Sequence, residues 1–307
     1  KEMAGVYDFL PLGLRVFKKI ENIIREEMNT IGGQEISMSA LQIPEIWSKT
    51  NRWDSPIWFT TKLTAGADLG LAFTHEEPIT NMLREQLSSY RDLPFSVYQF
   101  QTKFINETRA KSGIMRCREF VMKDLYSFCR NEEEHNIFYE KAKQAYVNVF
   151  KRVGIGHLTY LTFASGGAFS EFSHEFQTIT SAGEDIIYID ENKGMAINKE
   201  VHTDEVIANL GLNKADLVEQ KAVEVGNIFT LGTRFSDALD LSYQTESGEK
   251  KSVFMGSYGI GPGRLMGTVV EVLSDDKGNF NINILRLFPV STLYIALLLP
   301  IILDCLV

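Results

Sequence analysis

A basic loop near the middle of the chain offers the clearest chemistry in this sequence. Within residues 107–117 it carries Arg109, Lys111 and Arg116 around the flexible pair Ser112-Gly113. Guanidinium groups offer planar, paired donors to phosphate oxygens, so this basic loop suits a polyanion such as a nucleoside triphosphate. A solvated hairpin with ordinary surface charge would have the same composition, and the loop alone leaves both interpretations open.

Three further positions carry groups that could bind or react. Thr74 and Glu76 belong to a Thr-His-Glu-Glu-Pro run, where a hydroxyl and a carboxylate could hold a cationic amine. The alternative is that Thr74 caps a helix whose first turn is acidic. His174 follows a Gly/Ser-rich stretch, and a histidine there is more often structural than catalytic. Cys117 lies in the basic loop, either as a small filler or as a thiol with a lowered pKa.

A glycine-rich turn near the end of the chain is a second candidate phosphate site. Residues 256–273 read GSYGIGPGRLMGTVVEVL, which predicts a strand, a tight turn and a helix with Arg264 in its first turn. A helix N-terminus beside glycines suits nucleotide binding. The pattern is neither the dinucleotide fingerprint of a Rossmann fold nor a P-loop, so neither fold is supported.

The elements that must position these groups alternate between helices and strands. Two strands, at about 97–106 and 118–128, flank the basic loop, and Tyr98, Phe100, Thr102 and Phe104 share one face of the first. Short turns between neighbouring strands predict a mostly antiparallel sheet with flanking helices, an α+β fold. The other predicted helices are 11–31, 44–48, 75–90, 132–153, 202–210 and 214–217, and the other predicted strands are 34–40, 57–63, 69–73, 157–163, 185–189, 224–229, 239–244 and 251–256.

Composition limits the class of protein. The 307 residues are 44% apolar, enough for a large core, and the net charge of −9 argues against a general nucleic-acid coat. Cys117, Cys129 and Cys305 form no CxxC pair, which favours a reducing, cytoplasmic setting, and no signal-peptide pattern opens the chain. The apolar run 293–303 contains Pro300 and is shorter than the ~20 residues that span a bilayer, so we expect no membrane anchor.

Several long phrases, in order, resemble the catalytic domain of the prolyl-tRNA synthetases, which are class II aminoacyl-tRNA synthetases. They are GVYDFLPLGLRVFKKIENIIREEM, THEE, residues 98–128 (motif 2), FSHEF, EVGNIFTLGTRFS and GSYGIGPGRLMG (motif 3). The resemblance covers residues 5 to about 277. It implies a catalytic domain over 1–277, an atypical apolar tail over 278–307 and no anticodon-binding domain.

The resemblance also implies an activity, partners and site residues. ATP with Mg²⁺ and proline would give prolyl-adenylate, and the prolyl group would then move to the tRNA(Pro) acceptor end, in a homodimer. Arg118 and Arg264 would be the catalytic cations. The remaining roles are proline binding by Thr74, Glu76, Phe229 and His174, ATP binding by Glu107, Arg118, Phe120, Glu224, Asn227 and Arg264, and tRNA contact by Arg109.

The sequence departs from the family pattern where the reaction needs a cation. Motif 2 of the family reads Phe-Arg-x-Glu, whereas this chain has Phe104-Ile105-Asn106-Glu107, which predicts reduced activity. Ser39 and Phe73 replace two prolines of the family. The stretch from Glu119 to Gly256 is too short for the editing insertion of many bacterial members.

Two other functions remain open at this stage. A synthetase-like module could bind ATP, proline or a partner without turnover, as Ile105 suggests. A class II ligase for threonine or serine ranks last, because the sequence shows no Cys/His metal cluster.

Overall fold

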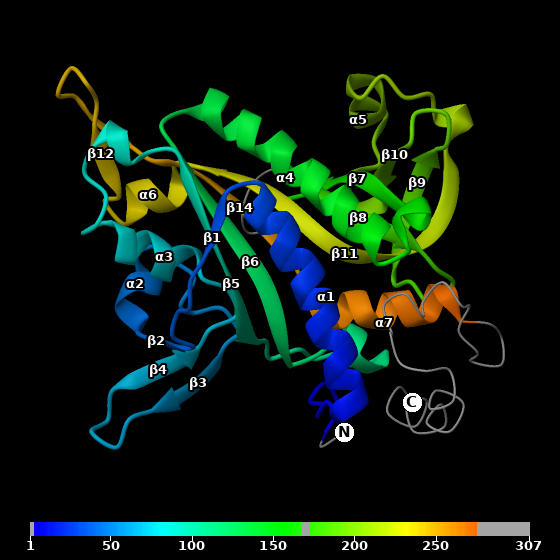
Figure 1. The fold of residues 1–307 in the computed structure, drawn as a ribbon, viewed down its shortest axis with the longest axis horizontal. Coiled ribbons are helices and arrows are strands. Elements are labelled where there is room, and N and C mark those ends of the chain that lie inside the picture. Colours follow the sequence, from blue (N-terminus) through cyan, green and yellow to red (C-terminus); the bar gives the residue numbers. More distant parts are fainter. Residues whose placement is uncertain (1–2, 167–171, 275–307) are drawn as a thin grey trace.

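A nine-stranded sheet lies at the centre of the chain in a computed structural model, which describes residues 3–166 and 172–274 (Figure 1). All neighbouring strands in it are antiparallel except the pairs β1–β5 and β10–β7. In spatial order the strands are β1 (Gly33–Glu35), β5 (Phe95–Phe104), β6 (Glu119–Cys129), β14 (Phe254–Ile260), β11 (Val218–Gly232), β8 (Phe172–Ile179), β7 (Thr159–Ser165), β10 (Met195–Asn198) and β9 (Asp185–Asp190).

Three helices cover one face of this sheet: α1 (Pro11–Thr30), α4 (Glu132–Arg152) and α7 (Pro262–Leu273). Helix α1 starts at Pro11, whose missing N–H costs nothing at the first helical position, and the chain turns at Gly32, where φ is +87°. Its apolar stripe, including Ile20 and Ile24, packs with α4 and the strands in the main core. Arg152 of α4 bonds to Glu26 and Glu27 of α1, which ties these two helices together.

The opposite face of the sheet is covered only in part. Ile79 and Leu83 of α3 (Glu76–Leu83) pack against Val97, Tyr126 and Met255 in a second core cluster, joined by α6 (Arg234–Ala238). The other elements are α2 (Pro44–Ser48), α5 (Asp204–Asn209), the small sheets β2 (Leu41–Gln42), β4 (Asp68–Leu71), β3 (Phe59–Lys62) and β12 (Ser242–Gln244), β13 (Lys250–Ser252), and 3₁₀ turns at Tyr90–Asp92, Gly113–Met115, Gly156–Leu158, Lys199–Val201 and Lys214–Asp216.

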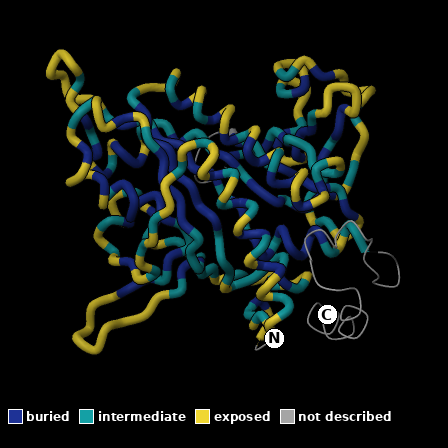
Figure 2. The backbone as a smooth tube through the Cα atoms, in the orientation of Figure 1, coloured by how far each residue is buried: buried dark blue, intermediate teal, exposed yellow. Residues whose placement is uncertain are grey.

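Burial follows this arrangement. The central strands and the inward sides of the helices are buried, whereas the β3–β4 hairpin projects from the body and is exposed over residues 60–68 (Figure 2). No helix among the described residues is long and apolar enough to cross a membrane. The predicted tail, 278–307, lies outside the described residues.

The predicted fold class is confirmed, and so are the long helices and the two strands beside the basic loop. The predicted strand 34–40 is mostly wrong, since the strand ends at Glu35. Beyond it, the main-chain N of Met38 donates to the Gln99 side chain and the main-chain O of Met38 accepts from the Gln101 side chain, in place of strand pairing. The predicted helix 75–90 is too long. It ends at Leu83, and Asp92 then accepts from Ser88 N and Ser89 N, a local pattern that competes with a helix. Strand β10 and helix α6 were not predicted.

Candidate active site

The partly covered face of the sheet carries two neighbouring rows of residues, which lie two positions apart along the strands. In the first row, Ser257 of β14 lies opposite Tyr126 of β6 and Phe229 of β11. In the second row, Gly259 lies opposite Asp124 and Asn227. Because side chains two residues apart share a face of a strand, about 6.5–7 Å apart, the two rows form adjoining parts of one surface.

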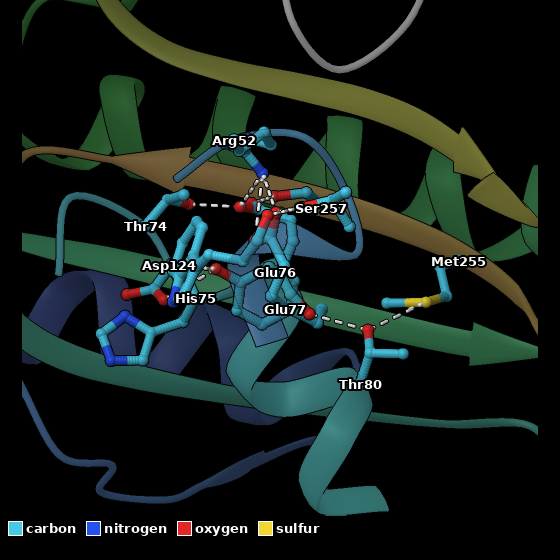
Figure 3. A network of polar contacts seen from close by, with 12 residues as sticks. Arg52, Thr74, His75, Glu76, Glu77, Thr80, Asp124, Met255 and Ser257 are labelled. Atoms are coloured by element: carbon cyan, nitrogen blue, oxygen red, sulfur yellow. Dashed lines mark hydrogen bonds and ion pairs between the residues drawn. The ribbon is translucent and has the colours of Figure 1, made fainter. Parts of the chain in front are cut away.

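Glu76 lies at the first row and is 2% exposed. Its Oε1 accepts from Ser257 Oγ at 3.1 Å and its Oε2 from Thr74 Oγ1 at 2.5 Å (Figure 3). Arg52 Nη1 lies 3.5 Å from the same Oε2, but it sits closer, 3.1 Å, to both oxygens of Glu77. Arg52 therefore compensates Glu77 first, so Glu76 remains the carboxylate directed at the sheet surface.

Helix α3 is not capped by Thr74, the alternative that the sequence left open. His75, not Thr74, is the N-cap residue, and it makes no side-chain capping bond. The Thr74 hydroxyl instead donates to Glu76, while Glu76 and Glu77 occupy the acidic first turn as expected. The capping role of Thr74 is thus wrong, and its hydroxyl belongs to the carboxylate pocket.

A buried chain of polar side chains lies beside this pocket on the same face of the sheet. Lys103 Nζ lies 2.5 Å from His75 Nδ1 and 2.9 Å from Asp124 Oδ2, and Tyr126 Oη donates to the same oxygen at 3.0 Å. His75 N donates to Tyr126 Oη at 3.2 Å, which joins the start of α3 to the sheet. Burial, followed by the Lys103 charge, lowers the pKa of His75 to about 4, so its ring is neutral and accepts from Lys103.

A cavity of about 200 Å³ lies at the second row. Strands β6 and β11 contribute Phe120, Met122, Glu224 and Asn227, helix α7 contributes Arg264, and the segment between β5 and β6 contributes Ile105, Glu107 and Arg116. At Gly259 a Cβ atom would lie 2.7 Å from Asn227 Oδ1, so only glycine leaves room for this amide. The structure thus brings five of the predicted ATP-binding residues to one cavity, namely Glu107, Phe120, Glu224, Asn227 and Arg264.

The basic loop is held at its base by Glu107. The carboxylate accepts from Arg109 N at 2.7 Å and from Arg116 Nε at 2.9 Å. Burial opposes its ionisation, but these hydrogen bonds outweigh that effect and lower the pKa of Glu107. Arg109 is exposed on the outside of the loop.

Arg118 does not lie in this cavity, contrary to the expectation that it contacts phosphates. Its Nε donates to the main-chain oxygen of Glu107 at 2.9 Å, and its Nη1 donates to that of Ala4 at 2.6 Å. Arg116, two residues earlier, lines the cavity instead. The side chains of Arg116 and Arg118 take different directions because the chain is irregular between the end of β5 at Phe104 and the start of β6 at Glu119. This irregular segment includes the 3₁₀ turn Gly113–Met115.

On the other side of the cavity, Arg264 is held both by the basic loop and by β11. Its Nε donates to Met115 O at 2.9 Å, and its Nη1 lies 3.3 Å from both Glu224 O and Glu224 Oε2. Asn227 Nδ2 also donates to Glu224, at 2.7 Å. Glu224 therefore positions both a cation and an amide at the cavity.

His174 and Phe229 lie on opposite faces of the sheet and cannot line one pocket, contrary to the expectation. His174 pairs with Ile228, which is buried in the core under α4, whereas Phe229 pairs with Ser173 and packs in the second core cluster on the other face. His174 Nδ1 contacts Tyr139 Oη of α4 at 2.8 Å. The structural alternative for His174 therefore fits the geometry.

Replacement of His174 by asparagine tests this assignment. Burial lowers the pKa of His174 to about 4, so between pH 6.5 and 4 the unfolded chain binds a proton that the folded chain does not. This contribution to stability is complete above pH 6.5 and is lost as the pH falls. The free energy of unfolding should fall between pH 7 and pH 5 in the unaltered chain. In His174→Asn this fall should be smaller by about 1–2 kcal/mol, measured by urea titration at both pH values. A large rise in KM for proline would instead indicate a binding role.

The sequence prediction missed Arg52, Lys103, Asp124, Tyr126 and Ser257. One signal was present: Lys103 and Asp124 are charged residues within predicted strands, and a charge on a buried face needs a partner. Arg52 had no such signal, because it reaches Glu77 from an irregular segment between α2 and β3.

Comparisons with known proteins found matches to this chain in both sequence and structure. Residues 59–273 match the tRNA synthetase class II core domain (G, H, P, S and T). The chain is 38% identical to the proline--tRNA ligase of Anaplasma phagocytophilum (strain HZ) over 291 residues, which cover 90% of this chain and 68% of that protein. It is 35% identical to that of Rickettsia peacockii (strain Rustic) over 293 residues, 91% of this chain and 68% of that protein.

The fold is also that of solved prolyl-tRNA synthetases. The Giardia lamblia enzyme in complex with prolyl-adenylate superposes with a TM-score of 0.72 at 17% identity, over 89% of this chain. The chain spans about half of that structure, 49% of its length. With two curated relatives above 30% identity and a family match over most of the sequence, the chain belongs to the proline--tRNA ligase family of class II aminoacyl-tRNA synthetases.

Proposed function

We propose that this chain activates proline with ATP to form prolyl-adenylate and passes the prolyl group to the acceptor end of tRNA(Pro). The observation that carries the proposal is the register of β6, β14 and β11. It sets the buried carboxylate pocket at Ser257 beside a cavity at Gly259, two positions along the same strand. The cavity is lined by arginines and an aromatic ring. A reaction between an amino acid and a nucleotide needs its two substrates at this kind of distance.

In this proposal the first row holds proline. Glu76, with Thr74 beside it, binds the secondary ammonium, since a carboxylate in a nearly water-free site gives strong charge-assisted hydrogen bonds. Phe229, opposite Ser257, offers its ring to the pyrrolidine. His174 has no part in this pocket, for the reason given above.

The second row holds ATP. Phe120 and Arg264 enclose the adenine from two sides, Glu107 orders the basic loop, and Arg116 takes the phosphate role for which Arg118 is unsuited. Glu224 and Asn227 lie near the ribose and could hold Mg²⁺ that enters with ATP. Their oxygens are the hard donors that this ion prefers, and one or two carboxylates suffice when phosphates complete the shell. When bound, the ion neutralises phosphate charge.

The chemical step needs no side-chain nucleophile. A carboxylate oxygen of proline attacks the α-phosphorus, a new P–O bond forms, and the bond to the bridging oxygen breaks as pyrophosphate leaves. The protein contributes alignment of the two substrates and cations for the developing charge. Arg109, exposed on the basic loop, would meet the tRNA end, and we assign this function to residues 1–277, acting in the cytoplasm as a homodimer.

Arg116 and Arg118 provide a matched pair of variants for the phosphate assignment. Arg116→Gln should lower kcat/KM for ATP by roughly 10- to 100-fold, because it removes a cation from the cavity. Arg118→Gln should stay within about three-fold, since its guanidinium serves main-chain oxygens. Proline-dependent ATP–pyrophosphate exchange at varied ATP measures both. The reverse order of effects would restore Arg118 to the phosphate role.

A non-catalytic module that binds ATP or proline is the second candidate, favoured by one observation. Ile105 lines the cavity at the position where the family carries the motif 2 arginine, and an aliphatic side chain cannot stabilise the reacting charge. Exchange by the unaltered chain above a Glu76→Ala control would rule this candidate out.

A further inference from the structure

Glu184 reaches the basic loop from a distant part of the chain. Its Oε2 accepts from Arg116 Nη1 at 2.6 Å, and its Oε1 lies 3.2 Å from Lys111 Nζ and 3.5 Å from Ser112 Oγ. These three partners occupy both ends of the 3₁₀ turn in the loop. A single carboxylate thus contacts the loop on either side of its bend.

The turn that carries Glu184 is itself rigidly placed. It links β8 to β9, and Gly183 packs so closely on β11 that a Cβ atom there would lie 2.4 Å from Ala222 O. Gly183 N donates to Thr180 O at 3.0 Å, and Thr180 N donates to Lys221 O at 3.1 Å. Glu184 therefore projects from a turn bonded to the sheet rather than from a free loop.

The Arg116 guanidinium is consequently held from two directions. Glu107 accepts a hydrogen bond from its Nε and Glu184 accepts one from its Nη1, while Nη2 has no bonded partner among the described residues. Arg116 also lines the cavity. Because the guanidinium is planar and two of its three nitrogens are bonded, the direction of the third nitrogen is fixed as well. The side chain therefore loses little rotamer entropy when it binds a ligand.

We propose that Glu184 is a positioning residue for nucleotide binding, which anchors the basic loop and orients Arg116 toward the phosphates of ATP. This inference rests on the proposed function, because it assumes that the cavity binds ATP. Burial opposes ionisation of Glu184, but the bonds from Arg116 and Lys111 outweigh it and lower the pKa of this carboxyl, so it is charged at neutral pH.

The experiment is an equilibrium titration of the full chain with ATP, by calorimetry, so that it does not depend on turnover. Glu184→Gln should weaken ATP binding by roughly 3- to 10-fold, a modest effect because both side chains are partly exposed. In an Arg116→Gln background the same substitution should change ATP binding by less than about two-fold, since the oriented group is gone. Glu191→Gln, an exposed carboxylate on the next turn, serves as the matched control.

Proteolysis supplies a second readout without any ligand. Trypsin cleavage after Arg109 and Lys111, followed by mass spectrometry, should be several-fold faster in Glu184→Gln than in the control variant. Unchanged or tighter ATP binding by Glu184→Gln would overturn the inference and leave the proposed function standing. Absence of ATP binding by the unaltered chain would overturn both.

Discussion

Replacement of Glu76 by glutamine is expected to lower kcat/KM for proline by roughly 10²- to 10³-fold. Glu76 is 2% exposed and receives bonds from Thr74 and Ser257, so a bound ammonium would meet its charge with little competition from water. Loss of one partner of a buried charge pair costs about 2–5 kcal/mol, or roughly 30- to 5,000-fold, and the expected loss lies within these limits. The fold should survive, because Arg52 keeps its two bonds to Glu77.

The effect should be confined to proline. Pyrophosphate exchange at varied proline and at varied ATP separates the two substrates, and KM for ATP should stay within about three-fold. Glu85→Gln, an exposed carboxylate just beyond α3, is the control. Equal losses for both substrates would indicate general disruption of the site and would contradict the assignment of Glu76 to the amine.

Replacement of Ile105 by arginine is expected to raise the exchange rate, by roughly 10- to 100-fold. Ile105 lines the cavity, so an arginine at this position would add a guanidinium to the proposed ATP site. Removal of one charge-stabilising donor from such a site costs 10²–10³ in rate, and its restoration should recover much of this factor. Lys103 cannot substitute, because its ammonium is buried between Asp124 and His75.

Two control variants separate charge from shape at this position. Ile105→Leu keeps the apolar volume and should leave the rate unchanged within about two-fold. Ile105→Lys adds a charge without the planar fork and should give a smaller gain than arginine. A rate for Ile105→Arg equal to that of Ile105→Leu would show that the missing cation does not limit this chain.

The parts of the fold that could be predicted from sequence are long elements with a regular pattern of apolar residues. The apolar stripe of α1 with Pro11 at its start and Gly32 at its end, and the alternation of β5, need no knowledge of partners. The segment 34–40 failed because its strand-like pattern was overridden by side chains of Gln99 and Gln101, more than 60 residues away. Local propensity contains no information about such contacts.

The candidate site divides in the same way. Residues on regular elements, such as Phe120, Asn227 and Arg264, could be placed through their family phrases and reach one cavity. His174 could not be placed, because one residue of register decides which face of β8 it occupies. The irregular path of the basic loop likewise decided between Arg116 and Arg118.

The most direct test of the account is proline-dependent ATP–pyrophosphate exchange by the unaltered chain and by Ile105→Arg, each against its Glu76→Ala counterpart. We predict exchange that requires proline, is slow in the unaltered chain, rises with arginine at position 105 and disappears without Glu76. Absence of exchange in both chains, with arginine in place, would contradict the proposal that this site activates proline.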